Sequence, residues 1–191
     1  EPHTVFCYDS HGIVRVDGRA QAEPVNPVLK QFTELTAMTP ELETLWQSLP
    51  LDGKPPQEQA ALLNKAAAGA LHYVTGLTGI STTAGQAFAL GSGVCQDYAH
   101  ILLALARRSG FAARYCMGLV PGEGATHAWV ELALPDGWHG YDPTFACEAG
   151  EEHLRFAVGR DAADCRAERG IFRGAAEQTL HTEMRLDVRK G

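Results

Sequence analysis

Cys95 occupies a position in which a thiol could act as a nucleophile. It follows the run Gly91-Ser92-Gly93-Val94 and opens a stretch whose apolar residues have helical spacing. At the first turn of a helix, unpaired backbone N–H groups and the positive end of the helix dipole stabilise a thiolate. The flanking glycines leave room for a substrate carbonyl. The alternative is a small core residue, which is the usual role of an isolated cysteine, and position alone leaves both interpretations open.

A histidine and an aspartate follow on a predicted β-hairpin. His127 opens one strand, and Asp142 closes the partner strand beyond a turn at Pro135-Asp136-Gly137. In that register Asp142 is the same-face diagonal neighbour of His127, at about 7–8 Å between backbones, which the two side chains can bridge. Taken singly, His127 could be a surface strand residue and Asp142 a turn former. With Cys95 they form the set required for a thiol nucleophile, a base and a carboxylate that orients the base.

Five further residues have more than one interpretation. Gln96 could support the backbone N–H of Cys95 in stabilising an oxyanion, although a solvated or structural glutamine is more usual. Trp129 shares a strand face with His127 and could shield the imidazole, or it could be a core tryptophan. Asp97 is either a first-turn carboxylate favoured by the helix dipole or a buried hydrogen-bond partner. The pair Arg160-Asp161 could shape a pocket or form a turn-stabilising salt link.

Composition limits the partners and the compartment. The net charge of −7, with scattered basic residues, argues against a nucleic-acid partner, since such binding requires Lys and Arg to neutralise phosphates. The sequence has no run of about 18 apolar residues, so no membrane helix is expected. The five cysteines include no C-x-x-C motif, and no acidic cluster of calcium-loop type is present, so we expect neither a metal nor another cofactor. Reduced thiols favour a cytoplasmic protein.

The elements that position these residues follow from periodicity and turn signals. Helices are predicted at 40–49 with Thr39 as N-cap, at 57–74, from a cap at Ser81 to about Leu90, and at 95–108. Strands are predicted at 5–8, 13–16, 113–120, 128–134, 138–141, 153–158 and 179–188, with a loop at 121–124. Helices that precede antiparallel strands indicate an α+β fold.

Three sequence blocks resemble the bacterial transglutaminase-like superfamily, whose members are often labelled cysteine proteases. The blocks are Gly93-Val94-Cys95-Gln96-Asp97-Tyr98-Ala99, Thr126-His127-Ala128-Trp129-Val130-Glu131 and Gly140-Tyr141-Asp142-Pro143-Thr144, and the segments 158–164 and 169–174 are also similar. The resemblance implies a papain-like core with the nucleophile helix packed on an antiparallel sheet. It makes Cys95 the nucleophile, His127 the base and Asp142 the orienting residue.

The resemblance also implies a domain division. Residues 36–191 would form the catalytic domain, and 1–35 would be a remnant of, or a linker from, an N-terminal β-rich region, as expected for part of a longer protein.

The resemblance indicates the catalytic residues more specifically than it indicates the substrate. The leading hypothesis is hydrolysis of a peptide or isopeptide amide in a peptide or protein substrate. One alternative is transfer of the acyl group to an amine, as in transglutamination, and another is a non-catalytic binding domain on the same fold. Oligomeric state does not follow from the sequence.

Overall fold

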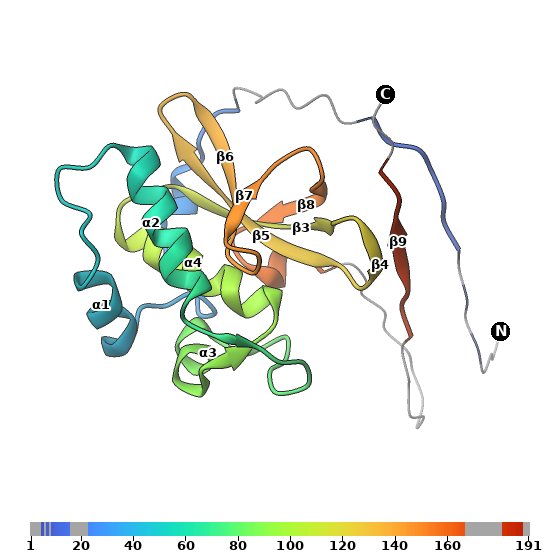
Figure 1. The fold of residues 1–191 in the computed structure, drawn as a ribbon, viewed down its shortest axis with the longest axis horizontal. Helices are drawn as coiled ribbons and strands as arrows, with labels where there is room; N and C mark the ends of the chain where they lie inside the picture. The colour runs from blue at the N-terminus through green and yellow to red at the C-terminus, as the bar shows by residue number, and fades with distance from the viewer. Residues whose placement is uncertain (1–4, 6, 8, 16–22, 167–180, 189–191) are drawn as a thin grey trace.

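A five-stranded antiparallel sheet with helices gathered on one side forms the body of the protein (Figure 1). The structure is a computed structural model, and it describes residues 5, 7, 9–15, 23–166 and 181–188. The helical elements are η1 (Pro27–Lys30), α1 (Pro40–Gln47), α2 (Pro56–Ala68), α3 (Ala84–Leu90), α4 (Cys95–Arg108) and η2 (Ala162–Asp164). The strands are β1 (His72–Tyr73), β2 (Ser92–Gly93), β3 (Ala113–Leu119), β4 (Gly122–Gly124), β5 (His127–Leu134), β6 (Gly137–Asp142), β7 (Cys147–Ala149), β8 (Leu154–Gly159) and β9 (Met184–Leu186). The predicted α+β class is confirmed.

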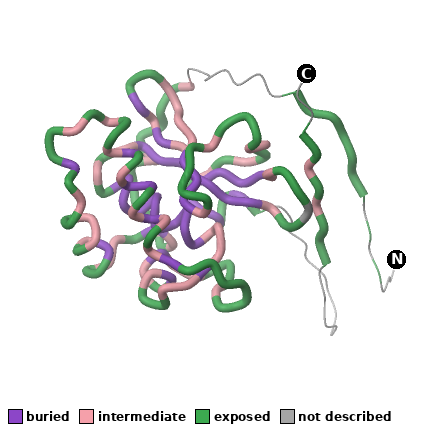
Figure 2. The backbone as a smooth tube through the Cα atoms, in the orientation of Figure 1, coloured by how far each residue is buried: buried purple, intermediate pink, exposed green. Residues whose placement is uncertain are grey.

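Helix α4 is the centre of the core. Every residue from Asp97 to Arg107 is buried, as the purple tube of Figure 2 shows along its length. The helix packs against β3 and β5 on one side and against α2 and α3 on the other. Ser109 caps its C-terminus, and Gly110 follows at φ 87°, a conformation that favours glycine. Because α4 is surrounded on all sides, its first residue is held in a fixed position relative to the sheet.

The sheet has the strand order β7-β6-β5-β3-β8. The β5–β6 hairpin pairs Val130 with Tyr141 and Leu134 with Gly137, so the connection is short, and Gly137 has φ 140°. This is the turn and register that the sequence predicts. Strand β3 lies between β5 and β8, and its ladder with β8 shifts between Met117 and Gly118.

Several predicted boundaries are wrong. The helix predicted over 57–74 ends at Ala68, because the chain then forms β1, which pairs in parallel with β2 through a bond from the backbone N–H of His72 to the Gly91 carbonyl (2.9 Å). Thr83, not Ser81, caps α3, in a reciprocal capping box with Gln86. The predicted cap of α1 at Thr39 is confirmed.

Strand predictions near the ends of the chain are also corrected. The loop predicted at 121–124 contains β4, which pairs with β9, and both lie on the side of the molecule opposite α1 and α2 (Figure 1). The strand predicted over 179–188 is limited to Met184–Leu186 among its described residues, and residues 179 and 180 lie outside them. Residues 5, 7 and 9–15 form no strand, and the other predicted strand positions there lie outside the described residues. No helix in the described ranges is long and apolar enough to cross a membrane.

The segment before α1 packs on the helical core. The buried guanidinium of Arg107 donates to the carbonyl of Leu29 (3.2 Å) and to the hydroxyl of Thr36 (2.6 Å). It also donates to the carbonyls of Ala113 and Arg160. Burial lowers the pKa of Arg107 to about 10, with a smaller contribution from the charge of Arg160, while Asp161 and Asp164 oppose the shift. The division between residues 1–35 and 36–191 remains a prediction.

Shortening a buried side chain of α4 should measure how much stability the packing of this helix provides. Leu103 is fully buried, so Leu103→Ala should lower the free energy of unfolding by about 2–5 kcal/mol in a urea titration. Leu90→Ala is the matched control, because Leu90 ends α3 with 52% of its surface exposed and should change stability by about 0.5 kcal/mol or less. Equal losses in the two variants would contradict a core centred on α4.

Candidate active site

Cys95 is the first residue of α4 and is partly buried, as the sequence predicts. The turn before it is fixed by Asp97, whose Oδ2 accepts the backbone N–H of Val94 (2.8 Å) and the hydroxyl of Thr78 (2.6 Å). Asp97 thus combines the two predicted interpretations, because it lies in the first turn of α4 and is also a buried hydrogen-bond partner. Burial raises the pKa of its carboxyl, and the two hydrogen bonds oppose that shift only in part. Asp97 thus holds the backbone that presents the thiol.

Gly93 makes room for this carboxylate. A Cβ at position 93 would lie 2.6 Å from Asp97 Oδ2 and 2.7 Å from its Cβ, so a larger residue would displace Asp97. Glycine is needed here for space, because the Asp97 side chain folds back over the strand that precedes Cys95.

The His127 imidazole and the Asp142 carboxylate meet on the β5–β6 hairpin. His127 Nε2 lies 2.6 Å from Asp142 Oδ2, and the two residues are only 8% and 0% exposed. The β5–β6 ladder, continued beyond its last pair, places position 127 opposite 144 and makes Asp142 the diagonal neighbour, as predicted. With Nε2 engaged by the carboxylate, Nδ1 is the ring nitrogen left to exchange a proton with a thiol.

The charges of this pair are strongly coupled. Burial alone would lower the pKa of His127, but the hydrogen bond that its ring donates to Asp142 and the nearby Cys95 side chain outweigh burial and raise the pKa to about 9. Burial would raise the pKa of Asp142, yet hydrogen bonds from His127 and His153 lower it to about 2. Both shifts favour a protonated imidazole beside an ionised carboxylate near neutral pH.

Aromatic rings enclose the imidazole. Trp129 is 1% exposed, and its ring lies 6.3 Å from that of His127 between centroids, so it combines the shielding and core roles considered for it. Phe145 stacks on His127 at 5.0 Å and is 58% exposed, so it covers the imidazole from the solvent side. Gln96 donates one of its two amide N–H groups to the carbonyl of Gly79 (3.1 Å), and its part in stabilising an oxyanion remains a prediction.

Sequence reasoning missed two residues at the site. Phe145 follows Asp142 in the connection to β7, and its backbone N–H also donates to Asp142 Oδ1 (3.3 Å). His153 lies 3.1 Å from Asp142 Oδ2 through its Nε2. It begins the strand predicted at 153–158, so its position at an element end was the available signal.

Arg160 and Asp161 stabilise a turn. Arg160 pairs with Asp164 at 2.9 Å, and Asp161 caps η2 by accepting the backbone N–H of Ala163 (2.8 Å). The pocket-shaping alternative considered for this pair has no support among these contacts.

Three residues at this site have donor atoms that a metal ion could bind. Donor atoms of His127, Asp142 and His153 lie within 4.8 Å of one another, a set that suits zinc, although the two imidazoles already bond to the carboxylate. The expected absence of a metal remains a prediction.

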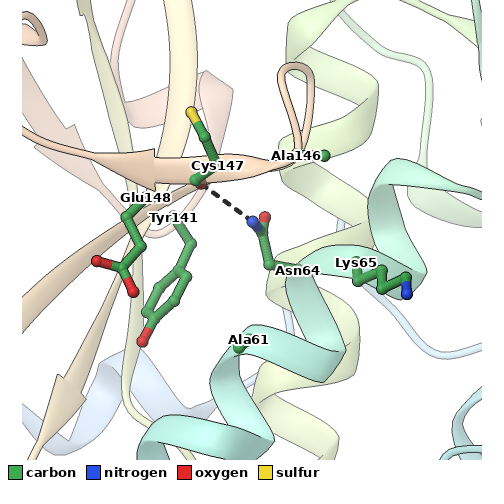
Figure 3. Close-up of a pocket in the computed structure, with 7 residues that line it drawn as sticks. All are labelled: Ala61, Asn64, Lys65, Tyr141, Ala146, Cys147 and Glu148. Carbon is green, nitrogen blue, oxygen red and sulfur yellow. Dashed lines mark hydrogen bonds between the residues drawn. The ribbon is translucent and has the colours of Figure 1, made fainter.

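A pocket of about 340 Å³ lies between α2 and the β6–β7 edge (Figure 3). It is lined by Ala61, Asn64, Lys65, Tyr141, Ala146, Cys147 and Glu148. The Asn64 amide closes one end by donating to the Cys147 carbonyl (3.1 Å). None of the three candidate catalytic residues lines this pocket.

Comparison with known proteins identifies the family. The model of the transglutaminase-like superfamily matches residues 44–143, which is more than half of the chain and includes Cys95, His127 and Asp142. This chain belongs to the transglutaminase-like superfamily. The resemblance noted from the three sequence blocks is thereby confirmed.

Relatives of this transglutaminase-like chain are bacterial. An uncharacterized protein of Mycobacterium leprae is 35% identical over 135 residues, covering 65% of this chain and 48% of that protein. An uncharacterized protein of Mycobacterium bovis is 33% identical over 132 residues, covering 61% and 42%. The chain therefore spans less than half the length of these curated relatives.

A crystal structure from Cytophaga hutchinsonii, named as that of a candidate cysteine protease, matches with a TM-score of 0.62 and 26% identity. The match covers 73% of this chain and 48% of that one. The superfamily and this neighbour together support thiol-dependent catalysis in general.

Enlarging Gly93 should disturb the nucleophile turn. Gly93→Ala should displace Asp97 from Val94, lower the free energy of unfolding by about 1–3 kcal/mol and slow alkylation of Cys95 by iodoacetamide. Gly79→Ala is the control, because a Cβ at position 79 meets nothing within 4 Å. If Gly93→Ala behaves like Gly79→Ala in both measurements, the close packing of Gly93 against Asp97 has no role in presenting Cys95.

Proposed function

We propose that this chain is a thiol hydrolase that cleaves a peptide or isopeptide amide, with Cys95, His127 and Asp142 as its catalytic residues. The observation that carries the proposal is the 2.6 Å contact between His127 Nε2 and Asp142 Oδ2. The Cys95 side chain, at the start of α4, is close enough to His127 to help raise the pKa of the imidazole. A buried imidazole held on a carboxylate next to a thiol is the arrangement that thiol acyl transfer requires.

The reaction would proceed through a thioester. The Cys95 thiolate attacks the amide carbonyl, and the His127 imidazolium protonates the leaving amine as the C–N bond breaks. Neutral His127 then removes a proton from water, the resulting hydroxide adds to the thioester carbonyl, and the C–S bond breaks to release the carboxylic acid and restore the Cys95 thiolate beside the His127 imidazolium. Backbone N–H groups at the start of α4 would stabilise the oxyanion in both steps. Asp142 keeps the imidazole oriented and stabilises its positive charge.

Exposed aromatic side chains near the reacting groups support a peptide or protein substrate. Tyr73 is 56% exposed and close enough to Cys95 for the thiol's charge to help raise the pKa of the phenol, after the larger effect of burial. Phe145 lies over His127 on the solvent side. Exposed aromatic surface near the thiol and near the imidazole would hold the side chains that flank the reacting amide. A cytoplasmic location and the lack of nucleic-acid or membrane partners remain predictions from composition.

Selective alkylation tests the thiol–imidazolium pair without a known substrate. Near pH 7, iodoacetamide should modify Cys95 at least about tenfold faster than Cys147, as measured by peptide mass spectrometry. Cys147 is the internal control, because the reagent can reach this exposed residue but its thiol is not activated. Residual burial and the charges of Asp142 and Glu148 raise the pKa of that thiol. His127→Gln should remove the advantage of Cys95. Equal rates at Cys95 and Cys147 in the unmodified protein would refute the proposal.

Product analysis distinguishes hydrolysis from transfer. With a fluorogenic peptide library as the substrate, Cys95→Ser should abolish turnover, since a serine hydroxyl is a much weaker nucleophile beside this base. A labelled primary amine added to the same reaction should remain unincorporated while free acid accumulates. Dominant incorporation of the amine would replace hydrolysis by transamidation, and full activity of Cys95→Ser would exclude both reactions at this residue.

A further inference from the structure

Asp142 contacts a second histidine besides His127. His153 immediately precedes β8, only 11% of its side chain is exposed, and its Nε2 lies 3.1 Å from Asp142 Oδ2. Both imidazoles therefore point at the same carboxylate oxygen. His153 takes no part in the acyl-transfer steps described above, so the function of this partly buried imidazole is still to be explained.

A backbone contact determines where His153 carries its proton. The N–H of Gly150 points at His153 Nδ1 at 3.3 Å, which makes Nδ1 the acceptor. A ring nitrogen that accepts a hydrogen bond carries no proton, so in this tautomer the proton is on Nε2, the nitrogen that faces Asp142. The loop between β7 and β8 thus presets His153 as a hydrogen-bond donor to the carboxylate.

With His153 included, the carboxylate of Asp142 has two donors on each oxygen. Oδ1 accepts the backbone N–H groups of Thr144 (2.9 Å) and Phe145 (3.3 Å), and Oδ2 accepts from His127 and His153. Without His153, Oδ2 would be held only by His127, which is the group that the carboxylate must orient. His153 provides a fixed point for Oδ2 that does not change when His127 gains or loses a proton.

Trp129 supports both imidazoles. Its ring stacks beside His127 at 6.3 Å and meets His153 edge-on at 5.2 Å, measured between centroids. Since Trp129 is almost completely buried, it limits the rotation of both rings about the carboxylate.

We propose that His153 is a positioning residue: it donates a hydrogen bond from Nε2 to Asp142 and so fixes the carboxylate that keeps the His127 proton on Nε2 and Nδ1 turned to Cys95. The proposal rests on the proposed function, because a fixed carboxylate matters only if His127 acts on the thiol. It adds a fourth side chain to the site and gives the β7–β8 loop a part in it.

Two substitutions separate hydrogen bonding from space filling. His153→Gln keeps an N–H donor of similar reach, whereas His153→Leu fills space without a donor. We expect His153→Leu to slow alkylation of Cys95 by iodoacetamide roughly tenfold to a hundredfold, and His153→Gln to stay within about threefold of the unmodified protein. Cys7, which is exposed, serves as the internal control for the reagent, and its rate should not change. Urea unfolding of both variants shows whether they remain folded.

The outcomes distinguish this inference from the proposed function. If Cys95 of the unmodified protein reacts no faster than Cys147, the proposed function and this inference both fail. If it reacts fast and His153→Leu reacts equally fast, or if Leu and Gln slow it equally, only the role of His153 is overturned.

An NMR spectrum of the unmodified protein gives a test that does not depend on whether a variant folds. Long-range ¹H–¹⁵N correlation at pH 8 should show His153 with its proton on Nε2 alone. A proton on Nδ1 would overturn the inference.

Discussion

The fold around the site depends on a carboxylate that is buried and charged. Asp142 is fully buried, and an unpaired charge there would cost several kcal/mol. Four donors remove that cost: two imidazoles on Oδ2 and two backbone N–H groups on Oδ1. To bring them together, β6 must end at Asp142, the chain must turn at once, and the loop after β7 must return His153 to the same place. The geometry of His127, and through it the chemistry available to Cys95, follows from satisfying this one group.

A second buried carboxylate shows the contrast. Asp97 is also fully buried, but it accepts only the Val94 N–H and the Thr78 hydroxyl on Oδ2, and its Oδ1 has no hydrogen-bond partner among the described residues. Burial therefore dominates and raises the pKa of Asp97. At Asp142 the hydrogen bonds and charges of His127 and His153 outweigh burial and lower the pKa to about 2. The two aspartates have different tasks: Asp142 supplies negative charge to a base, and Asp97 fixes the backbone turn that presents the nucleophile. Neighbours, not residue type, make the difference.

The sequence predicts those parts of the site that local rules determine. The short turn at Pro135-Asp136-Gly137 sets the hairpin register, and that register alone brings Asp142 to His127. Apolar spacing and the final glycine likewise define α4. Long-range backbone pairing is different: β1 ends the preceding helix early because β2, about twenty residues later, offers it hydrogen-bond partners. His153 was missed for the same reason, since its contact with Asp142 depends on the path of the β7–β8 loop and on the Gly150 N–H, which no periodicity encodes.

The hydrogen bonds that fix the geometry of the site come from a limited part of the chain. Every hydrogen bond described to Asp97 and Asp142 comes from residues between 78 and 153, so one continuous stretch fixes the nucleophile, the base and the carboxylate. The family match ends at residue 143, one position after Asp142, whereas His153 comes from the stretch beyond it. Cys95, His127 and Asp142 thus lie within the family match, and the loop after β7 adds a second imidazole contact to the carboxylate. The proposed function places substrate contacts on the exposed side chains of Tyr73 and Phe145, which can change while the Phe145 backbone N–H keeps its bond to Asp142.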